Sequence, residues 1–390
     1  MTSTPVGPVI FSATVNGVKS QTAPLDFEVQ QEWGKHDLFF ARVVVKKGLT
    51  YTKLLKSWPE GAAVDITWGR YPTSVQHWYG YINHHQINTE DDANGQNIQI
   101  TYVFIGTSAK MNGDKNRTWK SYTPTAMAST IARENSLRCV VTSTDWTLPY
   151  EVQAHESDFQ FLNRMADKVG MRFWVSGGTL YFIDPIVLLS GASNYFIPQY
   201  TINRAAYLQD TARNFELMQG SSIPGAFKMS RTVYGLDPDT GQVIQATADG
   251  DTYDDEIVNI HRNVTSTQEA KQIQNAAQAL SQFWRTGTVE VFGYSLLYPG
   301  KMIKIDGAVM PDDTAGNWIV MKVNHILKMS GSPDPVNDKY VSRLTISSNV
   351  SATIPFVKGV HKVTPEIIPC NLSGGKWQAQ QLNTVIEGVV

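Results

Sequence analysis

Cysteine is scarce in this 390-residue sequence, and neither sign of charge is in large excess. The 2 cysteines, Cys139 and Cys370, are too few for a disulfide framework or a thiolate zinc site, which predicts assembly in a reducing compartment. A formal net charge of −2 provides no basic surface of the kind that stable nucleic-acid binding needs. No apolar run approaches the ~20 residues that cross a bilayer, and residues 1–17 lack a signal peptide, so we expect no membrane segment.

The motifs of the common enzyme classes are also missing. The sequence contains no Walker A loop, G-x-G-x-x-G fingerprint, H-E-x-x-H helix or G-x-S-x-G elbow. We therefore predict no catalytic residue and no cofactor. A carboxylate pair for glycoside hydrolysis leaves no linear motif, because its two members meet only in space, so the sequence leaves that possibility open.

Three histidines and one acidic loop are the candidates for a metal site. His84 and His85 are neighbours on a predicted strand that also carries His77, and adjacent strand residues point to opposite faces, so they chelate one ion poorly. Residues 237–241 read Asp-Pro-Asp-Thr-Gly, like the start of a calcium loop, but the later acidic ligand of such a loop is missing. We predict structural or surface histidines, a hairpin turn at 237–241 and no metal site.

Residues 1–112 have the pattern of a β domain. Apolar residues alternate with polar ones at 25–29, 64–68 and 98–104, as they do in strands with one buried face. Asn16-Gly17 and Asn94-Gly95 are typical of tight hairpin turns, in which both central residues need a positive φ. Closing so many short strands into a barrel removes exposed edges, so we predict a β-barrel.

Residues 113–200 change character and predict a small α+β insert. Thr123 and Pro124 begin one helix, and Ser157 with Gln160 forms the capping box of a second helix, which ends at Gly170. This second helix carries an apolar stripe at helical spacing: Phe159, Leu162, Met165, Ala166 and Val169. A hairpin over 173–183 follows, with Gly177-Gly178 as its turn, and we expect the stripe to pack against it.

Residues 201–352 return to the β pattern, interrupted by one long helix that begins near Ser266 and ends near Trp284. Strands are predicted at 288–292, 302–305, 318–327 and 340–346, which indicates a second β-barrel similar to the first. The tail, 353–390, is punctuated by proline and glycine but is too apolar for a free linker. We therefore predict an extended arm that contacts a partner through Phe356, Ile367, Ile368 and Trp377.

Residues 156–166 (Glu-Ser-Asp-Phe-Gln-Phe-Leu-Asn-Arg-Met-Ala) resemble the ESDF-x-FL-x-R-x-A segment of phage tail and baseplate hub proteins. The same segment occurs in late control D proteins and in the N-terminal module of VgrG spike proteins. Downstream, residues 297–305 and 316–325 are similar to two strand entries of these families, and the resemblance covers about residues 120–347. The positions that match the motifs are Ser157, Asp158, Phe159, Phe161, Leu162, Arg164, Gly170, Pro299 and Gly300.

The resemblance implies two tube-like β-barrels flanking a small α+β domain, with no catalytic residues. It implies a homotrimer at the tail tip of the virion, assembled in the host cytoplasm, that adapts a six-fold tail tube to a three-fold spike. The implied partners are the tail tube or a distal tail protein, the tape measure protein and a central spike or fibre protein. DNA would pass through the lumen without stable binding.

One acidic stretch has two interpretations. Asp249, Asp251, Asp254, Asp255 and Glu256 are most simply a solvated loop, but on the wall of a DNA channel they would repel phosphate. Two other functions stay open. A tail-associated cell-wall hydrolase would need a further catalytic domain, and fewer than 40 residues follow position 352. A carbohydrate-binding tail protein is suggested by 10 Trp and 16 Tyr, although many of these lie at core-facing positions.

Overall fold

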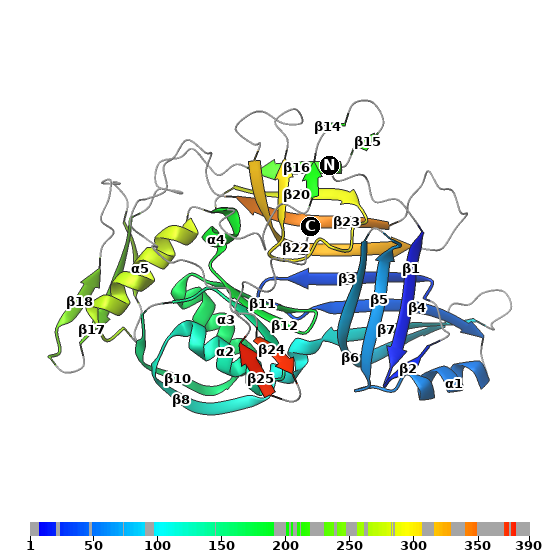
Figure 1. The fold of residues 1–390 in the computed structure, drawn as a ribbon, viewed down its shortest axis with the longest axis horizontal. Coiled ribbons are helices and arrows are strands. Elements are labelled where there is room, and N and C mark those ends of the chain that lie inside the picture. Colours follow the sequence, from blue (N-terminus) through cyan, green and yellow to red (C-terminus); the bar gives the residue numbers. More distant parts are fainter. Residues whose placement is uncertain are drawn as a thin grey trace.

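The structure is a computed structural model, and its largest element is one 13-stranded β-sheet (Figure 1). It describes residues 8–20, 24–46, 49–72, 74–89, 97–144, 146–190, 200–202, 204–205, 209–210, 212–218, 230–237, 240–246, 256–260, 264–281, 283, 285–305, 316–328, 340–348, 370–373 and 376–379. The strands of the sheet are β1 (Val9–Val15), β2 (Val18–Lys19), β3 (Asp26–Glu32), β4 (Leu38–Lys46), β5 (Ala63–Arg70), β6 (Ser74–Thr89), β7 (Asn97–Gly106), β13 (Tyr200–Ile202), β16 (Ala212–Met218), β20 (Arg285–Phe292), β21 (Met302–Ile305), β22 (Gly316–Lys328) and β23 (Tyr340–Ser348). Their order is β16-β20-β23-β22-β3-β4-β7-β6-β5-β1-β2, and β21 pairs with both β22 and β13.

The two β segments on either side of the insert, predicted as two β-barrels, both contribute strands to this one sheet. Strands β3 and β22 pair antiparallel, with Val29 opposite His325. Among the described strands, β16 and β2 stand at the two ends of the order, and no pairing closes either half. Alternating apolar residues indicate which face of a strand is buried, but the neighbour at each strand edge is decided by tertiary packing. The pattern therefore predicted the β-rich segments, and the two-barrel closure is not confirmed.

Each half of the sheet carries an apolar core, and aromatic side chains join the two halves. Phe27, Phe39 and Trp68 belong to one buried cluster in the N-terminal half. The ring of Trp68 lies 4.8 Å from that of His325 on β22, and Tyr340 of β23 packs in the same cluster. The C-terminal half is packed by Trp318 and mainly aliphatic side chains: Ile202, Val289, Val291, Leu297, Ile303, Ile305, Val320, Val323, Leu344 and Ile346.

The α+β insert is at the lower left in Figure 1, below the C-terminal strands of the large sheet and beside its N-terminal strands. It consists of β8 (Asp114–Tyr122), α2 (Pro124–Glu134), β9 (Arg138–Val141), β10 (Leu148–Ser157), α3 (Asp158–Val169), β11 (Arg172–Ser176), β12 (Thr179–Ile183) and α4 (Pro185–Ser190). The predicted helix signals are confirmed: Thr123 caps α2, Ser157 and Gln160 form the capping box of α3, and Gly170 ends α3 with a φ of 77°. The strands β11, β12 and β9 form a three-stranded sheet, and β8 pairs with β10.

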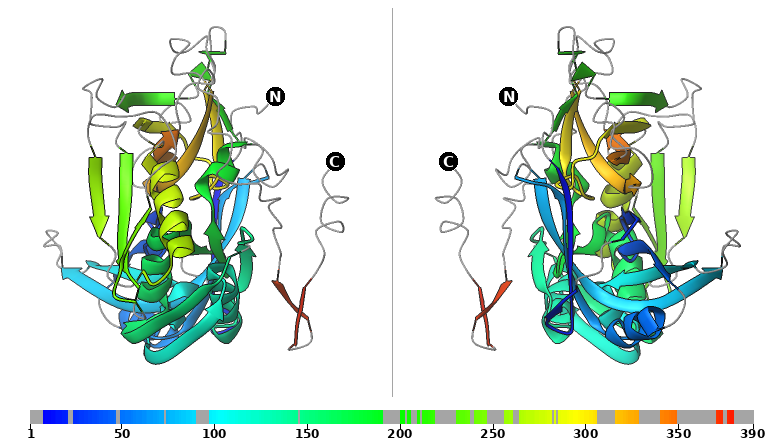
Figure 2. Two further views of the ribbon diagram at one scale, coloured as in Figure 1. Left: turned by 90° about the vertical axis from the view of Figure 1, so that its left-hand side faces the viewer. Right: turned by 90° about the vertical axis from the view of Figure 1, so that its right-hand side faces the viewer.

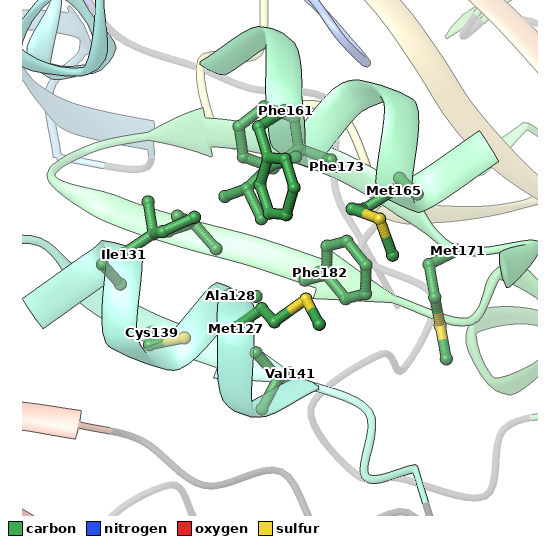
Figure 3. Close-up of a cluster of buried hydrophobic side chains, with 14 of the residues drawn as sticks. Met127, Ala128, Ile131, Cys139, Val141, Phe161, Met165, Met171, Phe173 and Phe182 are labelled. Carbon is green, nitrogen blue, oxygen red and sulfur yellow. The ribbon is translucent and has the colours of Figure 1, made fainter. Parts of the chain in front are cut away.

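The core of the insert confirms the predicted apolar stripe. Phe159, Leu162 and Met165 are 6%, 0% and 1% exposed, and they share a cluster with Phe173 and Phe182 of the hairpin. Figure 3 shows Phe161 and Met165 gathered with the hairpin side chains above α2. The periodicity was sufficient here because a 3.6-residue repeat places all these side chains on one face of a helix.

A smaller unit stands to one side of the large sheet (Figure 2). In it, α5 (Thr267–Ser281) packs against a sheet of β17 (Ser230–Leu236), β18 (Val243–Ala246) and β19 (Glu256–Ile260). The predicted turn at 237–241 joins β17 to β18, with Leu236 opposite Val243. The remaining short elements are α1 (Leu49–Ser57), the 3-10 helix η1 (Thr107–Met111), β14 (Arg204–Ala205) and β15 (Gln209–Asp210), and α1 was not predicted.

The C-terminal tail contains a short hairpin, of β24 (Cys370–Ser373) and β25 (Lys376–Ala379), where only an extended arm was predicted. Trp377 lies in β25 opposite Leu372, and β24 contacts β9. The other three predicted contact residues of the arm, Phe356, Ile367 and Ile368, lie outside the described residues. The same is true of the predicted hairpin turn at Asn94-Gly95. Of the acidic stretch, Glu256 begins β19, and the remaining four residues, Asp249, Asp251, Asp254 and Asp255, are not described. Within the described part of the chain, no helix has the length and apolar character that crossing a membrane requires.

Candidate functional site at the junction of sheet and insert

Asp158, the first residue of α3, connects the separate elements of the insert. Its buried carboxylate accepts hydrogen bonds from Lys115 Nζ at 2.6 Å, Arg117 Nη2 at 2.5 Å and Asn135 Nδ2 at 2.9 Å. Burial by itself raises the pKa of Asp158, but the hydrogen bonds from Lys115, Asn135 and Gln153 and the charge of Arg117 outweigh it and hold the pKa below its usual value. The side chain thus ties α3 to β8 and α2.

Arg164, two turns along α3, connects this helix to β10. Its guanidinium donates to Glu151 at 2.6 Å, to Glu156 at 2.7 Å and to the carbonyl oxygen of Val152 at 2.9 Å. It also lies over the ring of Phe161, 5.2 Å from the centroid. A planar fork of N–H donors satisfies two carboxylates and a carbonyl together, which a lysine does not do.

The turn between β3 and β4 binds the insert through hydrogen bonds and ring stacking. The sequence pattern did not predict these contacts. The Gly34 N–H donates to the carbonyl oxygen of Phe173 at 2.7 Å, and Asn163 Nδ2 donates to the Gly34 carbonyl oxygen at 2.8 Å. The ring of His36 stacks on Phe159 with centroids 4.0 Å apart. Each of these contacts joins the large sheet to α3 or β11, so the turn fixes the insert against the sheet.

A buried carboxyl group lies in the same turn. Gln31 Nε2 donates to Asp37 Oδ2 at 2.7 Å and also to Ser176 Oγ of β11 at 2.7 Å. Burial raises the pKa of Asp37 to about 7, although the hydrogen bonds from Gln31 and Ser176 oppose the rise. No local pattern distinguishes Asp37 from a surface turn residue, so only the fold reveals its burial.

The Pro299-Gly300 motif belongs to the same junction. Trp174 of β11 stacks between Trp33, at 5.9 Å, and Tyr181, at 4.8 Å. Gly300 has a φ of +87°, and a Cβ placed there would lie 2.4 Å from the Trp174 ring. The glycine is therefore required both by its backbone conformation and by the close approach of the indole.

The far end of α3 contacts α5. Lys168 forms ion pairs with Glu151 at 2.8 Å and with Glu269 of α5 at 2.9 Å, and both carboxylate side chains are 2% exposed. A Cβ at Gly170 would lie 2.6 Å from the Cβ of Ala276. The residues of α3 and Gly170 therefore contact three parts of the molecule: the insert core, the β3–β4 turn and α5.

The histidines singled out from the sequence do not converge. His77 Nδ1 lies 3.1 Å from Asp65 on an exposed strand face, and the half-buried His85 has its Nδ1 atom 3.0 Å from Glu60. Within the described residues, no group of three or more His, Cys, Asp or Glu side chains is placed to hold a metal ion. The residues brought together by the fold are instead the motif positions 157–170 and 299–300 around the β3–β4 turn.

Solved structures of similar fold include tail proteins of prophages and a component of a type VI secretion system. A tail protein from Neisseria meningitidis MC58 aligns over 88% of this chain and 97% of its own, with a TM-score of 0.62 and 13% identity. The 43 kDa tail protein of prophage MuSo2 from Shewanella oneidensis covers 87% and 98%, with a TM-score of 0.59 and 12% identity. The c3393 protein of E. coli, a type VI secretion component with similarity to T4 tail proteins, covers 87% and 77%, with a TM-score of 0.55 and 12% identity.

The chain belongs to the phage tail baseplate hub (GPD) family, whose model matches residues 60–331. A probable baseplate hub protein of Escherichia phage 186 is 33% identical over 103 residues, which are 26% of this chain and 25% of that protein. The aligned part thus spans about a quarter of that relative. The resemblance read from the 156–166 segment is confirmed, and the protein is a structural component of a phage-type tail.

Proposed function

We propose that this protein is the structural, non-enzymatic hub of a phage or phage-like tail tip, where it assembles as a homotrimer. It adapts a six-fold tail tube to a three-fold spike or fibre. The observation that carries this proposal is the β3–β22 pairing, which joins two β units of one chain into a continuous sheet. Three chains then supply six such units to the tube while keeping three-fold symmetry for the spike.

The same proposal assigns the solvent-facing side of the large sheet to the DNA channel. Three cross-strand ion pairs lie on this side, opposite the core: Arg343–Glu290 at 2.7 Å, Lys322–Glu32 at 3.4 Å and Arg42–Asp26. A cation that already has a carboxylate partner attracts phosphate weakly, so DNA passes without stable binding. The acidic stretch at 249–256 is proposed to contribute to the same wall.

The partners in this proposal are the tail tube or a distal tail protein, the tape measure protein and the central spike or fibre. The arm, residues 353–390, contacts a partner through Phe356, Ile367, Ile368 and Trp377. Motif residues 157–170 and 299–300 have no catalytic role and hold the insert in place against the sheet. The protein is assembled in the host cytoplasm and resides in the virion.

The test is the native mass of the purified full-length protein by sedimentation equilibrium, alone and after mixing with the spike protein. A species near three times 43.4 kDa is expected. Electron microscopy of the same sample should show a ring with a central opening. A monomer that stays monomeric with the spike protein would contradict the proposal.

A further inference from the structure

An open groove with a volume of about 350 Å³ lies where three parts of the chain meet. Strand β6 supplies His77 and Tyr79, β9 supplies Arg138, β12 supplies Tyr181, and the segment before β21 supplies Tyr298. The groove is therefore lined by residues of the large sheet, of the insert and of the segment that precedes β21. It borders the buried contacts of the β3–β4 turn, because Ser176, which accepts a hydrogen bond from Gln31, also lines the groove.

Arg138 supplies the guanidinium cation of this groove. Its Nη2 donates to the carbonyl oxygen of Gly177 at 2.9 Å, and within the described residues no Asp or Glu forms an ion pair with it. The nearby carboxylate of Asp65 is engaged by His77 at 3.1 Å. An exposed guanidinium held in place by a backbone carbonyl still presents several N–H donors to a ligand.

Three tyrosines lie beside Arg138 in the lining. The Tyr79 ring stacks on His77 with centroids 6.0 Å apart and a 12° interplanar angle, and its side chain is 39% exposed. Burial raises the pKa of Tyr298 to about 12, despite a hydrogen bond with Tyr181 and the charge of Arg138, so its phenol is protonated at neutral pH. The groove thus surrounds one positive charge with tyrosine side chains in a mainly polar lining.

We propose that this groove is a docking site for an acidic side chain of a partner protein in the tail, with Arg138 binding the carboxylate. One arginine among tyrosines is typical of protein interfaces, in which both residue types are enriched. A phosphate-binding surface would instead carry several lysines or arginines. The proposal rests on the proposed hub function only in naming the partner as a tail protein.

The experiment titrates the full-length protein with a hexaglutamate peptide by isothermal calorimetry at low salt. The wild type is expected to bind saturably, and Arg138→Gln to bind at least about tenfold more weakly, because a hydrogen-bonded charge is lost. Lys53→Gln on α1 removes another exposed cation, so it is the matched control and should bind like the wild type. Arg138→Lys keeps the positive charge but loses the planar guanidinium, so its affinity for the peptide should lie between those of the wild type and Arg138→Gln.

A 12-nucleotide DNA strand is titrated in parallel. Equal hexaglutamate affinity of the wild type and Arg138→Gln would overturn the proposal, and so would tighter, Arg138-dependent binding of the DNA. Thermal melts of each variant establish folding, since the described hydrogen bond of Arg138 reaches only a hairpin carbonyl. If the protein forms a trimer but does not bind the peptide, the proposed docking site is wrong and the proposed hub function is unaffected.

Discussion

The indole ring of Trp174 occupies the space in which a side chain at position 300 would begin. A Cβ on Gly300 would lie 2.4 Å from the ring, and the residue has a φ of +87°. One close contact therefore joins the β11 strand of the insert to the strand entry at β21, two segments that are far apart in the sequence. This contact explains why a glycine follows Pro299 in the motif at residues 297–305.

Gly300→Ala is expected to destabilise the protein more than a glycine substitution that meets only backbone strain. Gly61, with a φ of +79° and no atom within 4 Å of the place that a Cβ would take, is the matched control. The strain alone costs about 1–2 kcal/mol, and the clash with Trp174 adds to it at position 300. Urea unfolding of both variants measures the difference, and equal losses would contradict the proposed contact.

Leu162→Ala should lower the free energy of unfolding by about 2–5 kcal/mol, because a fully buried side chain leaves a cavity. Asp167→Ala on the same helix is the control, since the Asp167 side chain is 78% exposed and pairs with the Arg172 side chain at 3.4 Å. That substitution should change the free energy by less than about 0.5 kcal/mol. Calorimetric melting of both variants provides the measurement.

Asp158→Asn should lower the free energy of unfolding by about 1–3 kcal/mol at pH 7, because Lys115 and Arg117 lose a buried carboxylate but keep Glu134 as a partner. The pKa of Asp158 is lowered in the folded state, so its contribution is present above the unfolded value of 3.8 and is lost as the pH falls through the folded pKa. The stability gap between wild type and variant should therefore shrink as the pH falls from about 5 to about 2. A gap that stays constant over that range would show that the carboxylate charge is not what stabilises the fold.

Asp37→Asn should have the opposite pH dependence. The pKa of Asp37 rises from 3.8 to about 7 on burial, so the folded state favours the neutral carboxyl group. Stability is then lost as the pH rises from about 4 to 7, and the neutral amide avoids this loss. The variant should gain stability relative to the wild type, by up to a few kcal/mol, as the pH is raised from 5 to 8. Melting temperatures across that range test the sign, and a gap that does not grow would be inconsistent with a buried titrating carboxyl.

Deleting residues 353–390 should leave the sheet and the insert folded, because the clusters that pack them lie within residues 13–346. The loss is expected in assembly: weaker trimerisation or weaker attachment of the spike. Circular dichroism verifies the fold of the truncated protein, while sedimentation and pull-down with the spike protein measure assembly. Unchanged trimers that bind the spike with unchanged affinity would argue against a role of the arm in assembly.

Local signals in the sequence were enough to determine the caps and stripe of α3, the 173–183 hairpin and several strands of the second β segment. Ser157 with Gln160, and Gly170, act on atoms a few residues away, so their geometry follows from the order of residues alone. The motif at 156–166 likewise led to the hub family. Its role in fastening the insert was not readable, because Lys115, Arg117 and Asn135 reach Asp158 from other elements.

Only the tertiary structure decided how the β segments pair and where the insert is held. The β3–β22 pairing joins strands nearly 300 residues apart, and an alternating pattern contains no information about which edge meets which. The turn at 33–37 contains no motif that predicts a contact, yet His36 stacks on Phe159 and Asp37 is buried near Ser176. Contacts of this kind depend on the distance between remote atoms, and that distance exists only once the chain has folded.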